Sequence, residues 1–340
     1  MFSGHNILLT GGAGSVGRSL IPRLLETDLS TLRLFDNNEP GLARLKSQFE
    51  DDRCRFLAGD IRDKDRIQRA MENVDIVIHT AAMKHVDICE YNPFEAVKTN
   101  AIGLQNVVDT AIDENVGQVL FTSSDKAVDP ANTMGTTKLM GEKLVSAGNI
   151  HRGGSDIKLS SVRFGNVIKS SQSVIPIFRD QIRTGGPVTL TDERMTRFFL
   201  TYDDVFELVR GALEKSEGGE VFISKMPAIR IADLAEAMIQ TYAPKHGYDP
   251  ADIQIEIIGP RPGETFHEEL MTEREVLRTY ENGSLYAILP EETSIREPEI
   301  PSGFAESNRI TRSSENAEKL STDEIISLLE AEKPMVHINE

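Results

Sequence analysis

The fold of this chain is decided near its start by residues 7–17, which are ILLTGGAGSVG. Residues 7–10 form a short apolar run that stops at glycine, a pattern that predicts a buried parallel strand. From residue 15 to residue 26 the apolar side chains recur at the spacing of a helix. We therefore expect a strand, a tight glycine turn and a helix in direct succession.

Three glycines define this turn, because Gly11, Gly14 and Gly17 have the spacing G-x-x-G-x-x-G. The first allows the tight turn, the second lets a pyrophosphate approach the backbone, and the third lets the helix pack closely on the strand. Free N–H groups and the dipole at the helix start attract phosphate. The turn predicts a dinucleotide site, which we assign to these glycines together with Ser15, Val16 and Arg18.

An acidic residue follows at the distance that such a site requires. Asp36 closes a second predicted strand, residues 32–35, about 20 residues beyond the turn. There its carboxylate would accept a hydrogen bond from the adenosine ribose, which favours NAD. Arg18 could neutralise a 2′-phosphate, so NADP stays open as the alternative cofactor.

Strands and helices alternate up to about Gly165. Further strands are predicted at 55–58, 76–78, 118–122 and 159–162, and further helices at 93–115 and 134–146. This rhythm predicts an α/β fold of the Rossmann type, with a doubly wound parallel sheet and a smaller C-terminal α/β substrate domain. Ligands of such sheets bind at the carboxyl ends of the strands. We therefore add four cofactor contacts that follow the third and fourth strands: Asp60, Ile61, Ala81 and Ala82.

The remaining chain has shorter segments and more frequent glycine and proline turns. We expect a dinucleotide-binding domain at 1–165, with a returning segment near 195–225 that includes a helix at 202–215. A substrate-binding region is expected at 166–290, and a tail with one short helix near 322–329 at 291–340. The chain is predicted to cross between the two parts more than once.

Composition limits the classes of function. A formal net charge of −17 over 340 residues argues against nucleic acid or an anionic membrane as partner. No apolar run is long enough to span a bilayer, and no secretory signal is recognisable, so we expect a cytoplasmic protein. The two cysteines, Cys54 and Cys89, lack the spacing of a metal site, and no metal is expected.

The candidate catalytic segment begins at the end of the fifth predicted strand, where residues 122–127 are TSSDKA. In extended short-chain dehydrogenase/reductases, a hydroxyl residue here is followed by a Tyr-x-x-x-Lys pair on one helix face. This chain has Met134 and Lys138 instead, and none of its six tyrosines has a lysine four residues later. A thioether cannot transfer a proton, so the chemistry needs another base. Asp125 and Lys126, an adjacent acid and base, suit an elimination.

At this point the sequence resembles the nucleotide-sugar 4,6-dehydratases of the polysaccharide-biosynthesis (CapD-like) group, which act on UDP-N-acetylglucosamine. The resemblance extends from residue 7 to about residue 272. It is carried by the glycine turn and by AAMKHV at 81–86, CEYNPFEAVKTN at 89–100, SSDKA at 123–127, RFGNV at 163–167, MTRF at 195–198 and RPGE at 261–264.

The resemblance implies a reaction in three steps. The nicotinamide takes hydride from C4 of the sugar, Lys126 removes the C5 proton while Asp125 protonates the departing 6-hydroxyl, and the hydride returns to C6. The product is a UDP-4-keto-6-deoxy sugar, and the cofactor stays tightly bound and is recycled. Lys138 would hold the nicotinamide ribose. The base for the C4 hydroxyl stays open between Lys138, acting through a water, and Lys84.

The resemblance also implies the remaining contacts. Asn166 would contact phosphate or sugar, Arg197 and Arg261 the diphosphate, and Glu264 the uridine ribose. The further contacts expected with substrate are Lys84, His85, Ser124 and Val174, and those with cofactor are Lys84, Asn100, Thr122 and Ser123.

The helix predicted at 93–115 has apolar positions broad enough for a second contact beyond the sheet. Family members pair this helix with its copy, so we expect a homodimer or a higher homo-oligomer. Two alternatives to the dehydratase stay open. One is a nucleotide-sugar 4-epimerase or reductase of the same fold, and the other is an inactive NAD(P)-sensing regulator. The configuration at C5 and the glycan pathway served are not predicted.

Overall fold

The computed structural model describes residues 1–168, 174–259, 264–291, 298–307 and 309–331. The chain forms two compact units, each assembled from three segments. The larger unit comprises residues 1–164, 202–225 and 271–310, and the smaller comprises 165–201, 226–270 and 311–340.

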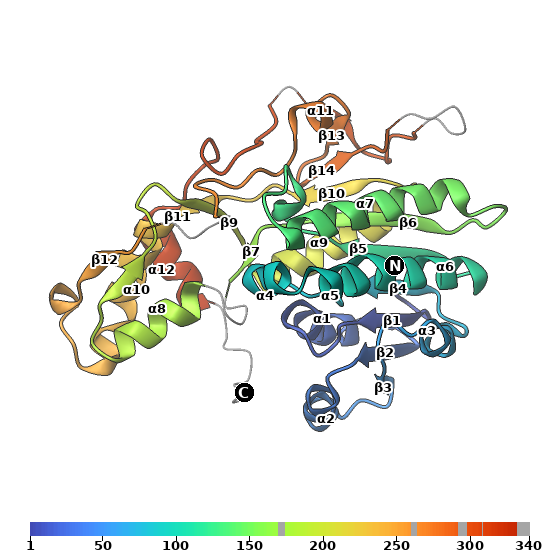
Figure 1. Cartoon of the computed structure of the whole chain (residues 1–340), viewed down its shortest axis with the longest axis horizontal. Coiled ribbons are helices and arrows are strands. Elements are labelled where there is room, and N and C mark those ends of the chain that lie inside the picture. Colours follow the sequence, from blue (N-terminus) through green and yellow to red (C-terminus); the bar gives the residue numbers. More distant parts are fainter. Residues whose placement is uncertain (169–173, 260–263, 292–297, 308, 332–340) are drawn as a thin grey trace. The chain divides into compact units, whose positions relative to one another are not determined.

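A ten-stranded sheet forms the centre of the larger unit, with the order β15-β13-β14-β10-β6-β5-β4-β1-β2-β3 (Figure 1). The strands from β10 to β3 in this order pair in parallel. The pairings of β14 with β10 and of β13 with β14 and β15 are antiparallel. The predicted doubly wound α/β fold is confirmed. The strands are β1 (Asn6–Thr10), β2 (Thr31–Asp36), β3 (Cys54–Ala58), β4 (Ile76–His79), β5 (Gln118–Thr122), β6 (Lys158–Arg163), β10 (Val221–Ser224), β13 (Thr279–Glu281), β14 (Leu285–Ile288) and β15 (Ala305–Glu306).

The reversal of strand order places the crevice of this sheet. β1 lies between β2 and β4, so the connections leave it in opposite directions. Loops at the carboxyl ends of these strands diverge there and leave room for a ligand. Leu8 and Leu9 of β1 are fully buried, as the apolar run in the sequence predicts.

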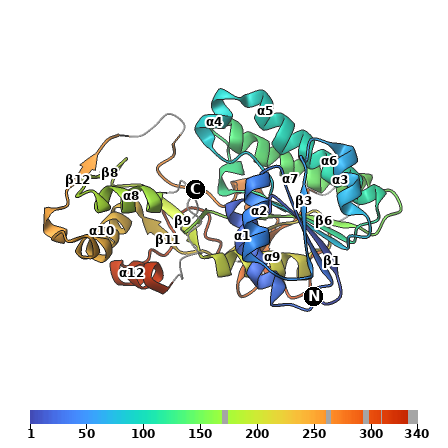
Figure 2. The ribbon, with the colours of Figure 1, turned by 90° about the horizontal axis from the view of Figure 1, so that it is seen from below.

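Helices cover both faces of the sheet. α1 packs beside α9 on one face, while α3, α6 and α7 cover the other (Figure 2). α9 contacts β5, β6 and β10, so the predicted returning helix does pack on the sheet. The helices of this unit are α1 (Ser15–Leu25), α2 (Glu39–Gln48), α3 (Lys64–Met71), α4 (Val86–Tyr91), α5 (Pro93–Val97), α6 (Gly103–Asp113), α7 (Thr133–His151), α9 (Tyr202–Lys215) and α11 (Glu273–Val276).

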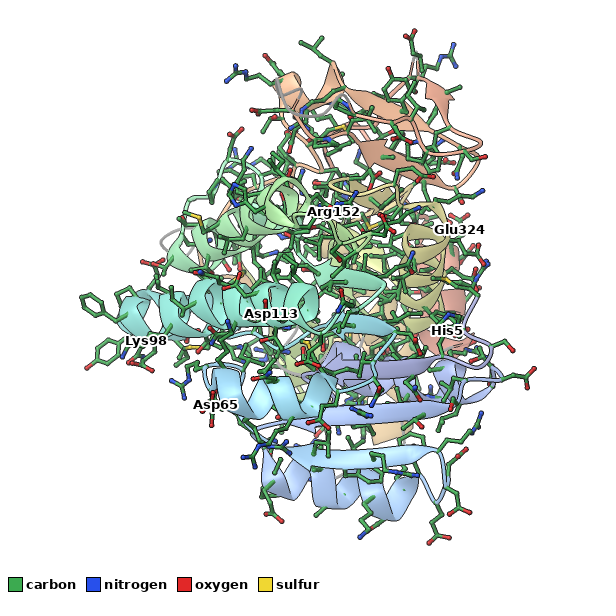
Figure 3. The ribbon with its side chains drawn as sticks, turned by 90° about the vertical axis from the view of Figure 1, so that its right-hand side faces the viewer. His5, Asp65, Lys98, Asp113, Arg152 and Glu324 are labelled. Carbon is green, nitrogen blue, oxygen red and sulfur yellow. The ribbon has the colours of Figure 1, made fainter. Side chains whose placement is uncertain are left out.

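The long helix predicted at 93–115 is not a regular α-helix throughout. A π-helical turn, η1 (Lys98–Ile102), separates α5 from α6. Asn100 lies in this turn and hydrogen-bonds the backbone of Met83 and the hydroxyl of Thr137. Figure 3 shows the helix with Lys98 and Asp113 labelled along it. Apolar periodicity could not predict the turn, because it depends on these tertiary hydrogen bonds.

The smaller unit has its own core, built from α8, α10, α12 and the strands beside them. Three strands form one sheet in the order β11-β9-β7, and β8 pairs with β12 in another. Their bounds are β7 (Asn166–Val167), β8 (Val188–Leu190), β9 (Thr196–Leu200), β11 (Ala228–Arg230), β12 (Ile255–Ile257), α8 (Val174–Arg183), α10 (Ile231–Tyr242) and α12 (Thr322–Ala331). Within the described residues, no helix has the length and apolar character needed to cross a bilayer.

Candidate functional site

A cavity of about 440 Å³ lies at the carboxyl ends of β1 to β4 in the larger unit. The structure brings seven of the predicted cofactor residues together on its wall: Gly11, Gly14, Asp36, Asp60, Ile61, Ala81 and Ala82. Sequence reasoning missed other lining residues, among them Asn37, Arg62, Thr80 and Thr99. Those that adjoin Asp36 and Asp60 could have been found by extending each strand end by one or two residues.

Side chains at Gly11 and Gly17 would clash with the backbone around this turn. Gly11 has a φ of +70°, and a Cβ there would lie 2.6 Å from the amide nitrogen of Ala81. A Cβ at Gly17 would lie 2.2 Å from the carbonyl oxygen of Gly11. At Gly14 a Cβ would meet only that same oxygen, at 3.2 Å, and the residue is exposed. The turn is thus tightly packed at Gly11 and Gly17 and open to solvent at Gly14, which fits a pyrophosphate at the start of α1.

Asp36 is held rigidly at the end of β2. Its Oδ2 accepts a hydrogen bond from the amide of Ala13 at 2.9 Å, and its Oδ1 accepts one from the amide of Asn38 at 2.8 Å. The carboxylate therefore links the glycine turn to the strand beside it. An anchored carboxylate at this position fits a ribose diol.

Arg62 lines the cavity, whereas Arg18 is not among its described lining residues. Arg62 pairs with Asp60 at 2.6 Å and Glu95 at 2.8 Å. Arg18 lies on α1, and its buried Nε has no hydrogen-bond partner among the described residues. Arg62 is thus already committed to two carboxylates.

The loop after β4 brings a lysine to the turn. Lys84 is exposed, and its Nζ lies 3.5 Å from the hydroxyl of Ser15 at the start of α1, where Val16 follows. His85 is the N-cap of α4, and burial together with Lys84 lowers the pKa of its imidazole. Lys84 therefore lies near both Ser15 and His85.

Asp125 and Lys126 lie together on a single 3₁₀ turn, η2 (Asp125–Ala127), directly after β5. The Oδ1 of Asp125 accepts hydrogen bonds from Ser124 Oγ at 2.8 Å and Lys126 Nζ at 3.1 Å. The side chain of Asp125 is 1% exposed and that of Lys126 is 27% exposed. The second carboxylate oxygen of Asp125 is buried without a hydrogen-bond partner in the described part of the chain. This arrangement offers one unsatisfied acidic oxygen and one accessible amine, which suits proton transfer to and from a substrate.

Met134 and Lys138 occupy successive turns of α7. Met134 is buried against Cys89 and Ala96, so its thioether belongs to a small apolar cluster. Lys138 is buried, and its Nζ donates to the carbonyl of Thr122 at 2.8 Å. Burial lowers the pKa of Lys138 to about 8. The lysine thus lies at the end of β5, and its pKa is close enough to neutral pH for the amine to be partly uncharged there.

Three predicted cofactor residues bond protein groups and are not part of the described cavity wall. Asn100 ties the loop after β4 to α7, as given above. Thr122 Oγ1 donates to the carbonyl of His79 at 3.1 Å, and Ser123 Oγ donates to Glu142 at 2.6 Å. Their side chains support the segment around the site.

The predicted substrate residues Asn166, Val174 and Arg197 belong to the smaller unit, on β7, α8 and β9. Arg197 donates to the carbonyls of Phe266 at 3.0 Å and Thr265 at 2.8 Å, and pairs with Glu268 at 3.3 Å. Glu264 is exposed on the same loop. Arg261 lies outside the described residues.

The sequence relatives of this chain include enzymes that are named for reactions on nucleotide sugars. Residues 7–290 match the family described as polysaccharide biosynthesis protein. An inverting UDP-N-acetylglucosamine 4,6-dehydratase of Campylobacter jejuni is 40% identical over 85% of this chain and 84% of its own. A UDP-glucose 4-epimerase of Rickettsia canadensis is 36% identical over the same shares. A protein of Methanocaldococcus jannaschii named as an uncharacterized membrane protein is 47% identical over 85% of this chain and 87% of its own.

A solved structure agrees with these matches. Pen from Bacillus thuringiensis superimposes with a TM-score of 0.88 at 40% identity, covering 98% of this chain and 99% of its own. The family match extends over most of the larger unit and much of the smaller. The relatives named above include enzymes that modify nucleotide sugars. Because of these matches, the chain belongs to the polysaccharide biosynthesis protein family.

Proposed function

We propose that this protein is a nucleotide-sugar 4,6-dehydratase that converts UDP-N-acetylglucosamine to a UDP-4-keto-6-deoxy sugar. The observation that carries the proposal is the Asp125–Lys126 pair on η2, with one buried carboxylate oxygen left for a ligand. The dehydratase relative at 40% identity supports the same assignment.

A nicotinamide cofactor, when bound, supplies hydride acceptance at C4 and hydride return at C6. The chain's own residues move the protons. Lys126, as a neutral amine, takes the proton from C5, and Asp125, protonated at Oδ2, gives its proton to the 6-hydroxyl as it leaves as water. The short distance between the two groups, 3.1 Å, lets the proton gained by Lys126 return to Asp125.

For the C4 hydroxyl we propose Lys138, acting through a water, as the base. Its pKa of about 8 lies close to the pH at which a base works best. Lys84 is exposed and beside Ser15, a setting that supports a role in binding phosphate instead. Met134 fills the tyrosine position with an apolar side chain and takes no part in proton transfer.

We further propose NAD as the cofactor. The anchored carboxylate of Asp36 would repel a 2′-phosphate, and Arg62 is already paired with two acids. Gly14, Ser15, Val16 and the other turn residues would hold the pyrophosphate. In the smaller unit, Asn166 and Arg197 would contribute to binding of the UDP group, Arg197 by holding the loop that contains Glu264.

The reaction distinguishes this proposal from its alternatives. Incubation with UDP-N-acetylglucosamine should give a product lighter by one water, about 18 mass units. An epimerase leaves the mass unchanged and yields a new sugar isomer, and an inactive regulator leaves the sugar unaltered. NMR of the product determines whether C5 is inverted, which the name of the Campylobacter relative favours.

The first testable prediction concerns Lys126. Lys126→Ala removes the proposed C5 base, so turnover should fall by about 10³-fold or more while NAD binding, measured by calorimetry, stays normal. Lys64→Ala is the matched control, because Lys64 is an exposed lysine of the same unit that also pairs with an aspartate, Asp113, at 3.7 Å. Near-normal turnover of Lys126→Ala would contradict the assignment.

We also propose that two copies of the chain associate through the outer surface of α4, α5 and α7. Apolar side chains that a monomer would leave in water gather on these packed elements. They are Ile88, Tyr91, Phe94, Val97 and Met140, together with Ile102 of the adjoining turn η1, and Tyr91 and Phe94 are 87% and 81% exposed. A cytoplasmic location and a role in surface glycan synthesis complete the proposal, and cell fractionation tests the location.

A further inference from the structure

A buried chain of polar groups lies directly behind the candidate catalytic segment. Ser123 Oγ donates to Glu142 Oε1 at 2.6 Å, and Arg163 donates to both oxygens of Glu142 at 3.0 and 2.6 Å. Arg163 also pairs with Glu275 at 3.0 Å. The network thus connects the end of β5 with α7, β6 and α11.

Stability alone is a weak reason for this network. The side chains of Arg163 and Glu142 are only 1% and 5% exposed, so both groups have lost their water. Desolvation of such ions cancels most of their attraction, and apolar residues of similar volume often stabilise a protein equally well. Buried charges in a fixed geometry are instead suited to holding a neighbouring group in one orientation.

The Glu142 end of the network faces a further buried cation, Lys138. Arg163 pairs with both Glu142 and Glu275, and Glu275 also pairs with Arg278 at 4.0 Å. Glu142 lies four residues after Lys138, on the same face of α7. Lys138 in turn is bonded to the carbonyl of Thr122, the residue before Ser123. Glu142 therefore accepts a hydrogen bond from Ser123 and faces Lys138, which is bonded to the preceding residue, Thr122.

We propose that Glu142 is a positioning residue, which fixes the turn at residues 122–125 through Ser123 and provides the counter-charge of Lys138. Arg163 orients the Glu142 carboxylate by donating hydrogen bonds to both of its oxygens. This inference rests on the proposed dehydratase function for its kinetic consequences, but its electrostatic part concerns the protein alone.

The electrostatics of Lys138 agree with this role. Burial lowers the pKa of its amine, while the charge of Glu142 is the main influence that raises it, followed by Cys89 on α4. His79 on β4 also lies near Lys138, but burial lowers its pKa to about 3, so it is neutral at working pH. Removal of the Glu142 charge should therefore lower the pKa of Lys138 further.

The test replaces Glu142 by Gln, which keeps an oxygen for Ser123 and Arg163 but removes the charge. In lysine-labelled protein with NAD bound, NMR titration should show the Lys138 pKa lowered by about one unit. The base form of Lys138 then persists to lower pH, so the acidic limb of the kcat–pH profile moves down by the same amount. The plateau kcat should fall about tenfold, with little change in KM.

Glu220→Gln is the matched control. Glu220 is a buried carboxylate of the same unit that accepts hydrogen bonds from Ser216 Oγ and the amide of Glu217, away from the candidate segment. This variant loses the same charge and should leave both the Lys138 titration and the kcat–pH profile unchanged. A similar effect from both variants would overturn the proposal, since loss of any buried carboxylate would then suffice.

The outcomes separate the positioning role from the proposed function. A wild-type protein that titrates as expected but does not dehydrate the sugar contradicts the function and leaves the electrostatic role of Glu142 supported. An active protein whose Glu142→Gln variant keeps its pKa and kcat contradicts the positioning role alone. If Glu142→Gln does not fold, Ser123→Ala takes its place, and an unchanged kcat in that variant sinks the proposal.

Discussion

The residues of the candidate catalytic segment differ in whether their polar atoms have hydrogen-bond partners. Met134 packs in an apolar cluster, and Lys138 and Ser123 each donate a hydrogen bond to a protein oxygen. Asp125 alone among these four keeps a buried oxygen without a partner in the described residues. An unsatisfied buried carboxylate oxygen costs free energy, and a ligand that donates a hydrogen bond to it would offset that cost.

Asp36 allows a direct prediction about cofactor choice. Asp36→Asn removes the negative charge that opposes a 2′-phosphate, so affinity for NADP relative to NAD should rise about tenfold or more. Calorimetric titration with both dinucleotides measures the ratio. Asp52→Asn removes the same charge from an exposed position and should leave the ratio unchanged. A ratio unaffected by Asp36→Asn would contradict the preference for NAD.

Regular elements could be predicted from the sequence because their signals are local. Burial on both faces makes β1 and β4 continuous apolar runs, and β5 was predicted at its observed bounds, Gln118–Thr122. The π-helical turn η1 could not be predicted because it depends on the tertiary hydrogen bonds of Asn100. The helix α4 has only 6 residues, too few for its apolar spacing to indicate a helix. The Glu142–Arg163–Glu275 network was missed for a related reason, because its members lie far apart in sequence.

The junction of β1 and α1 gives the prediction at the scale of elements. Gly17→Ala places a Cβ 2.2 Å from a backbone oxygen that cannot move without shifting the strand. We expect a loss of about 1–3 kcal/mol in the free energy of unfolding and weakened NAD binding. Gly154→Ala is the control, since its Cβ would meet nothing within 4 Å. Denaturant unfolding of the two variants provides the measurement, and equal stability would contradict the close packing.

The whole molecule combines a net charge of −17 with a local apolar surface on α4, α5 and α7. Strong like charge opposes non-specific association, so the proposed contact between copies would have to be specific and self-complementary. The phosphates of the proposed substrate would likewise be bound by backbone amides and a few cations, since the long-range field repels them.

Phe94→Glu tests the proposed association at this scale. A carboxylate buried in an apolar interface should weaken the dimer at least about 100-fold, because its desolvation is uncompensated. Analytical ultracentrifugation of the variant should show a lower mass than the wild type. Leu277→Glu is the matched control, since Leu277 is 88% exposed outside this surface. A wild-type monomer, or a Phe94→Glu variant of unchanged mass, would contradict the proposed surface.

The division of each unit into three chain segments has a consequence for how such genes diverge. The chain passes from one unit to the other after residues 164, 201, 225, 270 and 310. A single recombination event therefore cannot exchange one unit for that of a relative, because it would leave both with segments of mixed origin. New sugar preferences within this architecture are expected to arise by point substitution and loop change, with the interleaved scaffold inherited as one block.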